Sequence, residues 1–199
     1  MPGREPPYNA PLSQRPLGLG KSPDMHYPTL TVKEMAKLPI GDLFARDSAL
    51  VMWATYPLLD QAIELGKAWG YQYKSVSFTW AKLNKKAAQR WSYPADDSNW
   101  FMGCGYSTRA NPEVALLFTR GKGLKRMNAG VRNLVVAPVA RHSKKPDEVY
   151  GRLERLYGDV NRVEIFARQR WENWWSIGNE LSGMDIRDEL PLYLQGQIV

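Results

Sequence analysis

The sequence predicts an α/β fold in which an open, mostly parallel sheet is covered by helices on both faces. Residues 49–54 form a continuous apolar run, as in a strand buried on both sides. Apolar residues then recur at helical spacing from 58 to 69 and stop before Gly70. A second strand-like segment covers 71–80. Strands that alternate with helices in this way favour a parallel sheet.

Shorter signals place the remaining elements. Thr31 and Glu34 have the spacing of a capping box, which predicts a short helix that ends near Lys37. Pro146, followed by Asp147 and Glu148, has the features of a first helical turn and predicts a helix at 146–156. Apolar runs predict further strands at 114–119, 134–137 and 162–167.

Composition limits the class of protein. The 199 residues, 44% of them hydrophobic, fit one domain over 1–199. The single Cys104 excludes an intramolecular disulfide, and with two histidines we expect no metal site. Neither a membrane-spanning apolar run nor a signal peptide is visible in the sequence. We expect a soluble cytoplasmic protein with no membrane partner.

Basic residues point to nucleic acid as a partner. The net charge is +7, and no acidic residue occurs between Glu113 and Asp147. Two long segments, 82–106 and 120–132, are predicted to be loops, and loops of that length in compact domains are usually functional. The alternative is a solvated charged face, because phosphate affinity depends on clustering as well as on charge. The candidate nucleic-acid contacts are Lys82, Lys85, Lys86, Arg90, Lys122, Lys125 and Arg126.

Several short strings occur in a particular order along the chain: EPPY at 5–8, HYPTL at 26–30, LVMWAT at 50–55, RHSKKPDEVY at 141–150, EIFAR at 164–168 and IGNEL at 177–181. Together they resemble the N-6 adenine methyltransferase family, which includes the catalytic subunit of the eukaryotic mRNA adenosine methylase and phage and bacterial DNA-modifying enzymes. The resemblance covers roughly residues 5–181. It implies a Rossmann-like methyltransferase fold that uses S-adenosylmethionine.

The resemblance implies that Glu5, Pro6, Pro7 and Tyr8 form the catalytic tetrad. An exocyclic adenine amine is a weak nucleophile, and a carboxylate and a backbone carbonyl that accept its hydrogens would turn its lone pair toward the methyl group. Proline offers such a carbonyl without a competing N–H, and Tyr8 could stack on the base. The family usually has Asp and Trp where this chain has Glu5 and Tyr8. Without the resemblance, EPPY reads as a polyproline-like turn.

The resemblance also implies a cofactor site late in the chain. Its residues would follow a predicted strand, where ligands of α/β sheets bind. Core packing of Phe166, a cap or turn role for Asn179 and a solvated position for Lys145 are the structural alternatives. The candidate cofactor residues are Lys145, Glu164, Phe166, Arg168, Asn179 and Glu180.

These observations predict methyl transfer to the N-6 amino group of adenine, in DNA rather than RNA because the small chain resembles the phage and bacterial members. The second hypothesis is a catalytically silent nucleic-acid-binding module. Only four residues precede EPPY, where the family has a strand, so we expect this form to methylate weakly. A fragment, a strand borrowed from a partner subunit or homodimer, and a degenerate relative all remain open.

Overall fold

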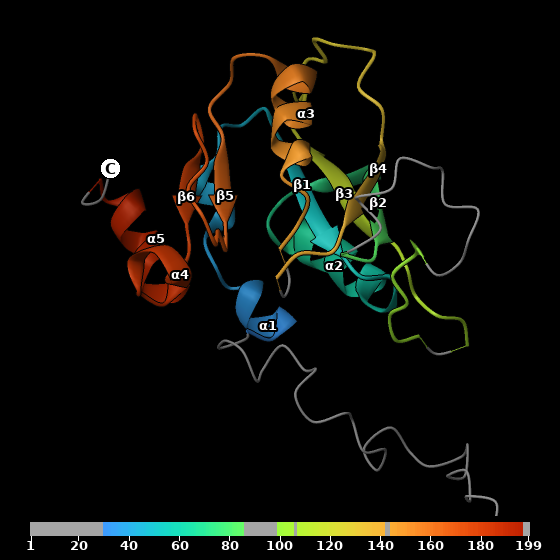
Figure 1. Ribbon diagram of the computed structural model, residues 1–199. Helices are drawn as coiled ribbons and strands as arrows, with labels where there is room; N and C mark the ends of the chain where they lie inside the picture. Colours follow the sequence, from blue (N-terminus) through green and yellow to red (C-terminus); the bar gives the residue numbers. More distant parts are fainter. Residues whose placement is uncertain (1–29, 86–98, 106, 142–143, 197–199) are drawn as a thin grey trace, which may run out of the picture.

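The computed structural model describes residues 30–85, 99–105, 107–141 and 144–196 (Figure 1). The first half contains α1 (Val32–Met35), the 3-10 helix η3 (Ile40–Leu43), β1 (Ser48–Ala54), the 3-10 helix η4 (Tyr56–Leu58), α2 (Leu59–Ala68) and β2 (Gln72–Leu83). The second half contains β3 (Glu113–Arg120), β4 (Leu134–Pro138), α3 (Glu148–Tyr157), β5 (Val163–Ile165), β6 (Trp175–Ile177), α4 (Asn179–Ser182) and α5 (Ile186–Leu194). Within the described ranges, no helix has the length and apolarity to cross a membrane.

The main sheet has the strand order β1-β3-β2-β4. Strand β3 is antiparallel to both β1 and β2, whereas β4 is parallel to β2. The prediction of a mostly parallel sheet is therefore wrong, and the sheet is mixed. The cause is that β3 returns between β1 and β2, the two parallel strands that α2 joins. A central strand is buried on both faces whatever its direction, so its composition alone does not reveal its orientation.

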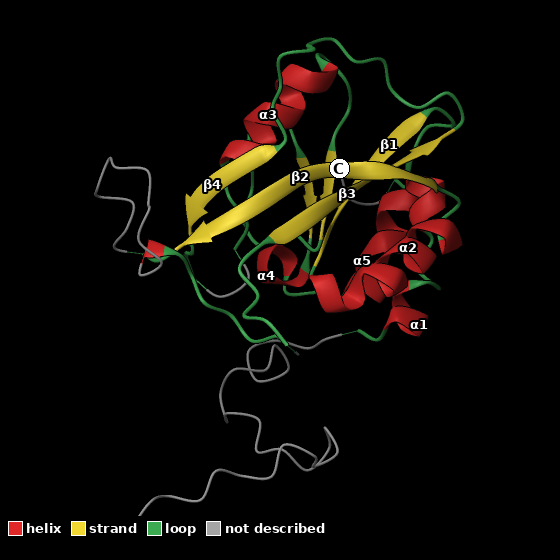
Figure 2. Ribbon diagram, turned by 90° about the vertical axis from the view of Figure 1, so that its right-hand side faces the viewer, coloured by secondary structure: helices red, strands yellow, loops and turns green. Residues whose placement is uncertain are grey.

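Helices pack on both faces of this sheet, as predicted (Figure 2). Alternate residues of β3 serve the two sides, since Leu116 and Phe118 pack with Leu65 of α2 and Ala115 packs with Val149 of α3. Gly66 of α2 lies so close to Phe118 that a Cβ there would come within 2.3 Å of the ring. The sheet is thus the middle layer between α2 and α3.

Strands β5 and β6 form a separate parallel pair on the side of β1 (Figure 1). Their pairing is in register, with Glu164 opposite Ser176. Neither β6 nor the following helices were predicted. Helix α5 packs Ile186 and Leu190 into the same core as α2, and the Asp185 carboxylate caps its start by accepting from the Arg187 N–H at 2.9 Å.

Several element boundaries follow their local sequence signals. The Thr31–Glu34 capping box is present, although α1 ends at Met35 rather than near Lys37. Gly70 adopts φ 84° directly after α2, as its predicted stop role requires. Strand β2 continues three residues beyond the predicted end, to Leu83, so the first residues of the predicted loop 82–106 belong to the sheet.

Candidate functional site

A cavity of about 1630 Å³ is lined by both β1 and β5, together with residues of α4 and of the segment before α3. Ligand pockets usually measure about 300–1,000 Å³, so this cavity has room for more than one small group.

Glu164 on β5 presents one hydrogen-bonded and one free carboxylate oxygen. Its Oε1 accepts from the Tyr150 hydroxyl at 2.8 Å, whereas its Oε2 is buried and has no partner within the described part of the chain. Burial raises the pKa of Glu164, the Tyr150 hydrogen bond lowers it, and nearby Asp147 raises it further, with a net rise. A buried acceptor without a donor is costly, so Oε2 is suited to a ligand hydroxyl or amine.

Phe166 follows β5 and has φ 62°, a left-handed conformation that few residues other than glycine adopt. This turn ends β5 two residues before the predicted end of the strand at 167, and Phe166 is 42% exposed beside the cavity. The next residue, Ala167, is buried against Gly178, where a Cβ would lie 2.3 Å from the Ala167 carbonyl oxygen. The backbone around Phe166 is therefore fixed by close packing.

Helix α4 brings the last candidate cofactor residues to the cavity. Asn179 is its first residue and is exposed, and Glu180 follows it. The Arg168 guanidinium forms an ion pair with the Glu180 carboxylate, which joins the segment after β5 to α4. Asn179 and Glu180 both line the cavity.

Glu113, the first residue of β3, holds two lysines with its two carboxylate oxygens. Lys82 Nζ lies 2.6 Å from Oε1, and Lys145 Nζ is bonded to Oε2. Burial opposes the ionisation of Glu113, but the two ammonium groups more than compensate, so its pKa is lowered. The Lys145 ammonium also lies 5.7 Å from the centre of the Trp53 ring.

The structure gathers the predicted cofactor residues in one place. Lys145, Glu164, Phe166, Arg168, Asn179 and Glu180 all line the same cavity. They come from three separate segments of the chain: the segment before α3, β5 with the residues after it, and α4. The predicted tetrad Glu5, Pro6, Pro7 and Tyr8 lies outside the described residues.

The candidate nucleic-acid residues that the structure describes differ in their exposure to solvent. Lys85, Lys122, Lys125 and Arg126 are exposed, the last three on the connection between β3 and β4. Lys82 differs, because its side chain is 14% exposed and its charge is neutralised by Glu113. Lys86 and Arg90 lie outside the described residues.

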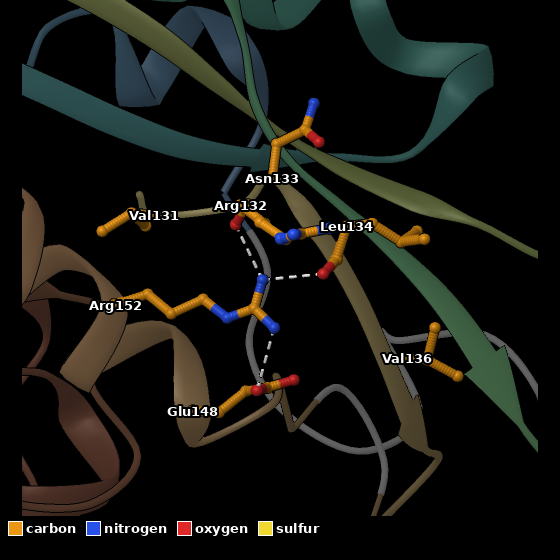
Figure 3. Close-up of a pocket in the computed structure, with 7 residues that line it drawn as sticks. All are labelled: Val131, Arg132, Asn133, Leu134, Val136, Glu148 and Arg152. Atoms are coloured by element: carbon orange, nitrogen blue, oxygen red, sulfur yellow. Dashed lines mark hydrogen bonds and ion pairs between the residues drawn. The ribbon is translucent and has the colours of Figure 1, made fainter. Parts of the chain in front are cut away.

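A second hollow, of about 680 Å³, lies between α3 and the start of β4 (Figure 3). Its basic residue Arg152 donates to the carbonyl oxygens of Arg132 and Leu134, each at 2.7 Å, and pairs with Glu148 at 3.1 Å. Arg152 thus connects α3 to β4. The six candidate cofactor residues line the larger cavity, so we place the candidate functional site there.

Two residues of the site were missed by sequence reasoning. Tyr150 supports Glu164, and its ring stacks on Trp171 with centroids 4.5 Å apart. Glu113 organises Lys82 and Lys145. An acidic residue directly before a continuous apolar strand was the available signal for Glu113, since a charge placed there needs a partner.

An α/β protein with a large cavity at the end of a parallel strand, lined by an exposed aromatic ring and by carboxylate and amide groups, has the features of a nucleoside-binding enzyme. Comparisons with known proteins define the class further. The MT-A70 family profile matches residues 4–180. This chain belongs to the MT-A70 family, whose methyl donor is S-adenosylmethionine.

The relatives differ in how much of their own length this chain covers. The type II methyltransferase M.MunI of Mycoplasma sp is 31% identical over 178 residues, which are 89% of this chain and 67% of the relative. The human N(6)-adenosine-methyltransferase catalytic subunit METTL3 is 30% identical over 171 residues, or 83% of this chain and 27% of METTL3. A Drosophila melanogaster MT-A70-like protein is 30% identical, with 26% of its length covered. The chain thus spans about a quarter of the adenosine methyltransferases that it matches.

Proposed function

We propose that this chain transfers a methyl group from S-adenosylmethionine to the N-6 amino group of adenine in DNA. The observation that carries the proposal is the arrangement of all six candidate cofactor residues around one cavity. Membership of a methyltransferase family supports the reaction class. The greater covered share of the bacterial relative supports DNA over RNA as the substrate.

The residues present fit the cofactor. The unpartnered Oε2 of Glu164 would accept from a ribose hydroxyl, and the exposed Asn179 amide would bind the same sugar. The Phe166 ring would pack on the adenine, and the Lys145 ammonium would bind the methionine carboxylate. When bound, the sulfonium supplies a methyl group that is already electrophilic, so the protein has mainly to align the reactants.

The tetrad Glu5 to Tyr8 completes the proposal. Glu5 and the Pro6 carbonyl would accept the two hydrogens of the adenine amine, and Tyr8 would stack on the base. The exposed residues Lys122, Lys125 and Arg126 would contact phosphates. Recognition by charge in this loop requires no particular base sequence.

Calorimetric titration with S-adenosylmethionine, followed by tritiated-methyl transfer to DNA and to RNA, tests the proposal. Asn179→Ala should weaken cofactor binding about three- to tenfold, as expected for one lost hydrogen bond. Asn133→Ala is the matched control, because Asn133 is exposed at the other hollow. Absence of cofactor binding by the unmodified chain would refute the proposal. Binding of cofactor and DNA without transfer would instead favour the silent nucleic-acid-binding module.

A further inference from the structure

Glu113 lies between two lysines that differ in their access to the cavity. Lys145 and Glu113 both line the cavity, whereas Lys82 is not among its lining residues. The exposed fractions of the side chains are 12% for Glu113, 14% for Lys82 and 29% for Lys145. Glu113 therefore joins Lys145, which lines the cavity, to Lys82, which does not.

Lys82, which does not line the cavity, is held firmly by its neighbours. It belongs to β2, and its backbone N–H and carbonyl are both bonded to the Asn111 side chain, at 3.2 and 2.8 Å. Its ammonium lies 5.0 Å from the centre of the Trp80 ring and 5.6 Å from that of Phe101. These contacts fix the position of the charge that Glu113 faces.

Lys145, in contrast, precedes α3 and belongs to neither sheet. Its ammonium is bonded to the Glu113 carboxylate and lies beside the Trp53 ring. A long, flexible lysine side chain loses little of its freedom unless a partner fixes it. Glu113 is the only carboxylate within salt-bridge distance of Lys145 in the described part of the chain.

We propose that Glu113 is a positioning residue that holds the Lys145 ammonium in the orientation that binds the carboxylate of the cofactor, with Lys82 as its anchor. Two ammonium groups and one carboxylate leave one positive charge, and this charge faces the cavity through Lys145. An anionic carboxylate matches that excess charge. The inference rests on the proposed function, because it assigns Lys145 to the cofactor.

Two ligands separate positioning from general structural support. S-adenosylhomocysteine carries the amino-acid carboxylate, and 5′-methylthioadenosine keeps the nucleoside but lacks that carboxylate. Glu113→Gln should weaken S-adenosylhomocysteine about tenfold in calorimetry, the effect of losing a hydrogen bond to a charged group, and change methylthioadenosine affinity less than about twofold. Lys145→Ala should show the same selective loss. Glu148→Gln is the control, because Glu148 is also ion-paired but lies at the other hollow.

A second measurement does not depend on the cofactor. Acylation of lysine amines, followed residue by residue with mass spectrometry, should be faster at Lys145 in Glu113→Gln than in the unmodified chain, by about tenfold, and unaltered in Glu148→Gln. Equal weakening of both ligands, or an unchanged Lys145 acylation rate, would overturn the inference. If Lys145→Ala impairs S-adenosylhomocysteine binding while Glu113→Gln does not, the inference fails and the proposed function stands. If the unmodified chain binds neither ligand, the proposed function fails and acylation alone decides the positioning role.

Discussion

Glu113 on β3 and Glu164 on β5 are both shielded from water beside the same cavity, yet their pKa values move in opposite directions. Burial is the largest influence on each and raises both. At Glu113 two lysines reverse the effect, whereas at Glu164 a tyrosine hydroxyl does not. The neighbours, more than the depth of burial, decide whether a carboxylate in this protein serves as a counter-ion or as a hydrogen-bond acceptor.

The largest effect on stability should come from breaking the Glu113 cluster. Glu113→Gln leaves two ammonium groups near each other without a counter-charge, so the free energy of unfolding at neutral pH should fall by about 2–3 kcal/mol. Urea denaturation of the variant and of the Glu148→Gln control measures this. A change below about 0.5 kcal/mol would contradict the importance of the cluster.

The stability difference between the unmodified chain and Glu113→Gln should depend on pH, and this dependence tests the contrast between Glu113 and Glu164. Because the folded pKa of Glu113 lies below its unfolded value, its contribution is complete above the unfolded pKa and is lost as the pH falls through the lowered folded pKa. The stability of the unmodified chain should therefore approach that of Glu113→Gln in acid. Denaturation curves taken from neutral pH down to about pH 3 test this, and a constant difference would contradict it.

Glu164→Gln should change the free energy of unfolding in the opposite direction to Glu113→Gln, and by a smaller amount. The folded pKa of Glu164 is raised, so its stabilising contribution is present below the unfolded pKa and lost as the pH rises through the folded value. An amide resembles the protonated acid and still accepts from Tyr150, so the variant should equal the unmodified chain at neutral pH or exceed its stability by up to about 1 kcal/mol. A clear loss at neutral pH in urea denaturation would show that the charged form is required.

Exposed charges should have the smallest effect on stability. Reversal of Lys122, Lys125 and Arg126 to Glu should change the free energy of unfolding by less than about 0.5 kcal/mol. It should weaken DNA binding and flatten its dependence on salt, both measurable by fluorescence anisotropy. Reversal of three exposed lysines, Lys33 on α1, Lys37 after α1 and Lys74 on β2, controls for net charge. Equal DNA affinity in the two triple variants would place the phosphate contacts elsewhere.

Local elements could be predicted from the sequence because their signals are local. The run at 49–54 corresponds to β1, the helical spacing at 58–69 to η4 and α2, and the capping box at Thr31 to α1. Helix α5 also had a signal, since Asp185 caps it and Ile186 and Leu190 share one face, but Pro191 inside the helix works against its helix propensity.

Long-range pairing could not be predicted in the same way. The spacing of hydrophobic residues indicates which side chains are buried, but it does not indicate which strands are neighbours in the sheet. The central position of β3 was therefore missed. The three-residue β6 is too short to show a period. The candidate cofactor residues were predicted from the family resemblance, whereas Glu113 and Tyr150 contact partners distant in the sequence and became visible only in the structure.

The place of β3 between β1 and β2 has a consequence for how the chain acquires its fold. Ser48 pairs with Arg120 and Ala54 with Val114, so β1 cannot form its pairing with β3 until that later part of the chain has been synthesised. Folding of this kind is dominated by non-local contacts and is intrinsically slow. Until β3 is synthesised, β1 and β2 lack the strand that lies between them, and unpaired strand edges of this kind favour aggregation.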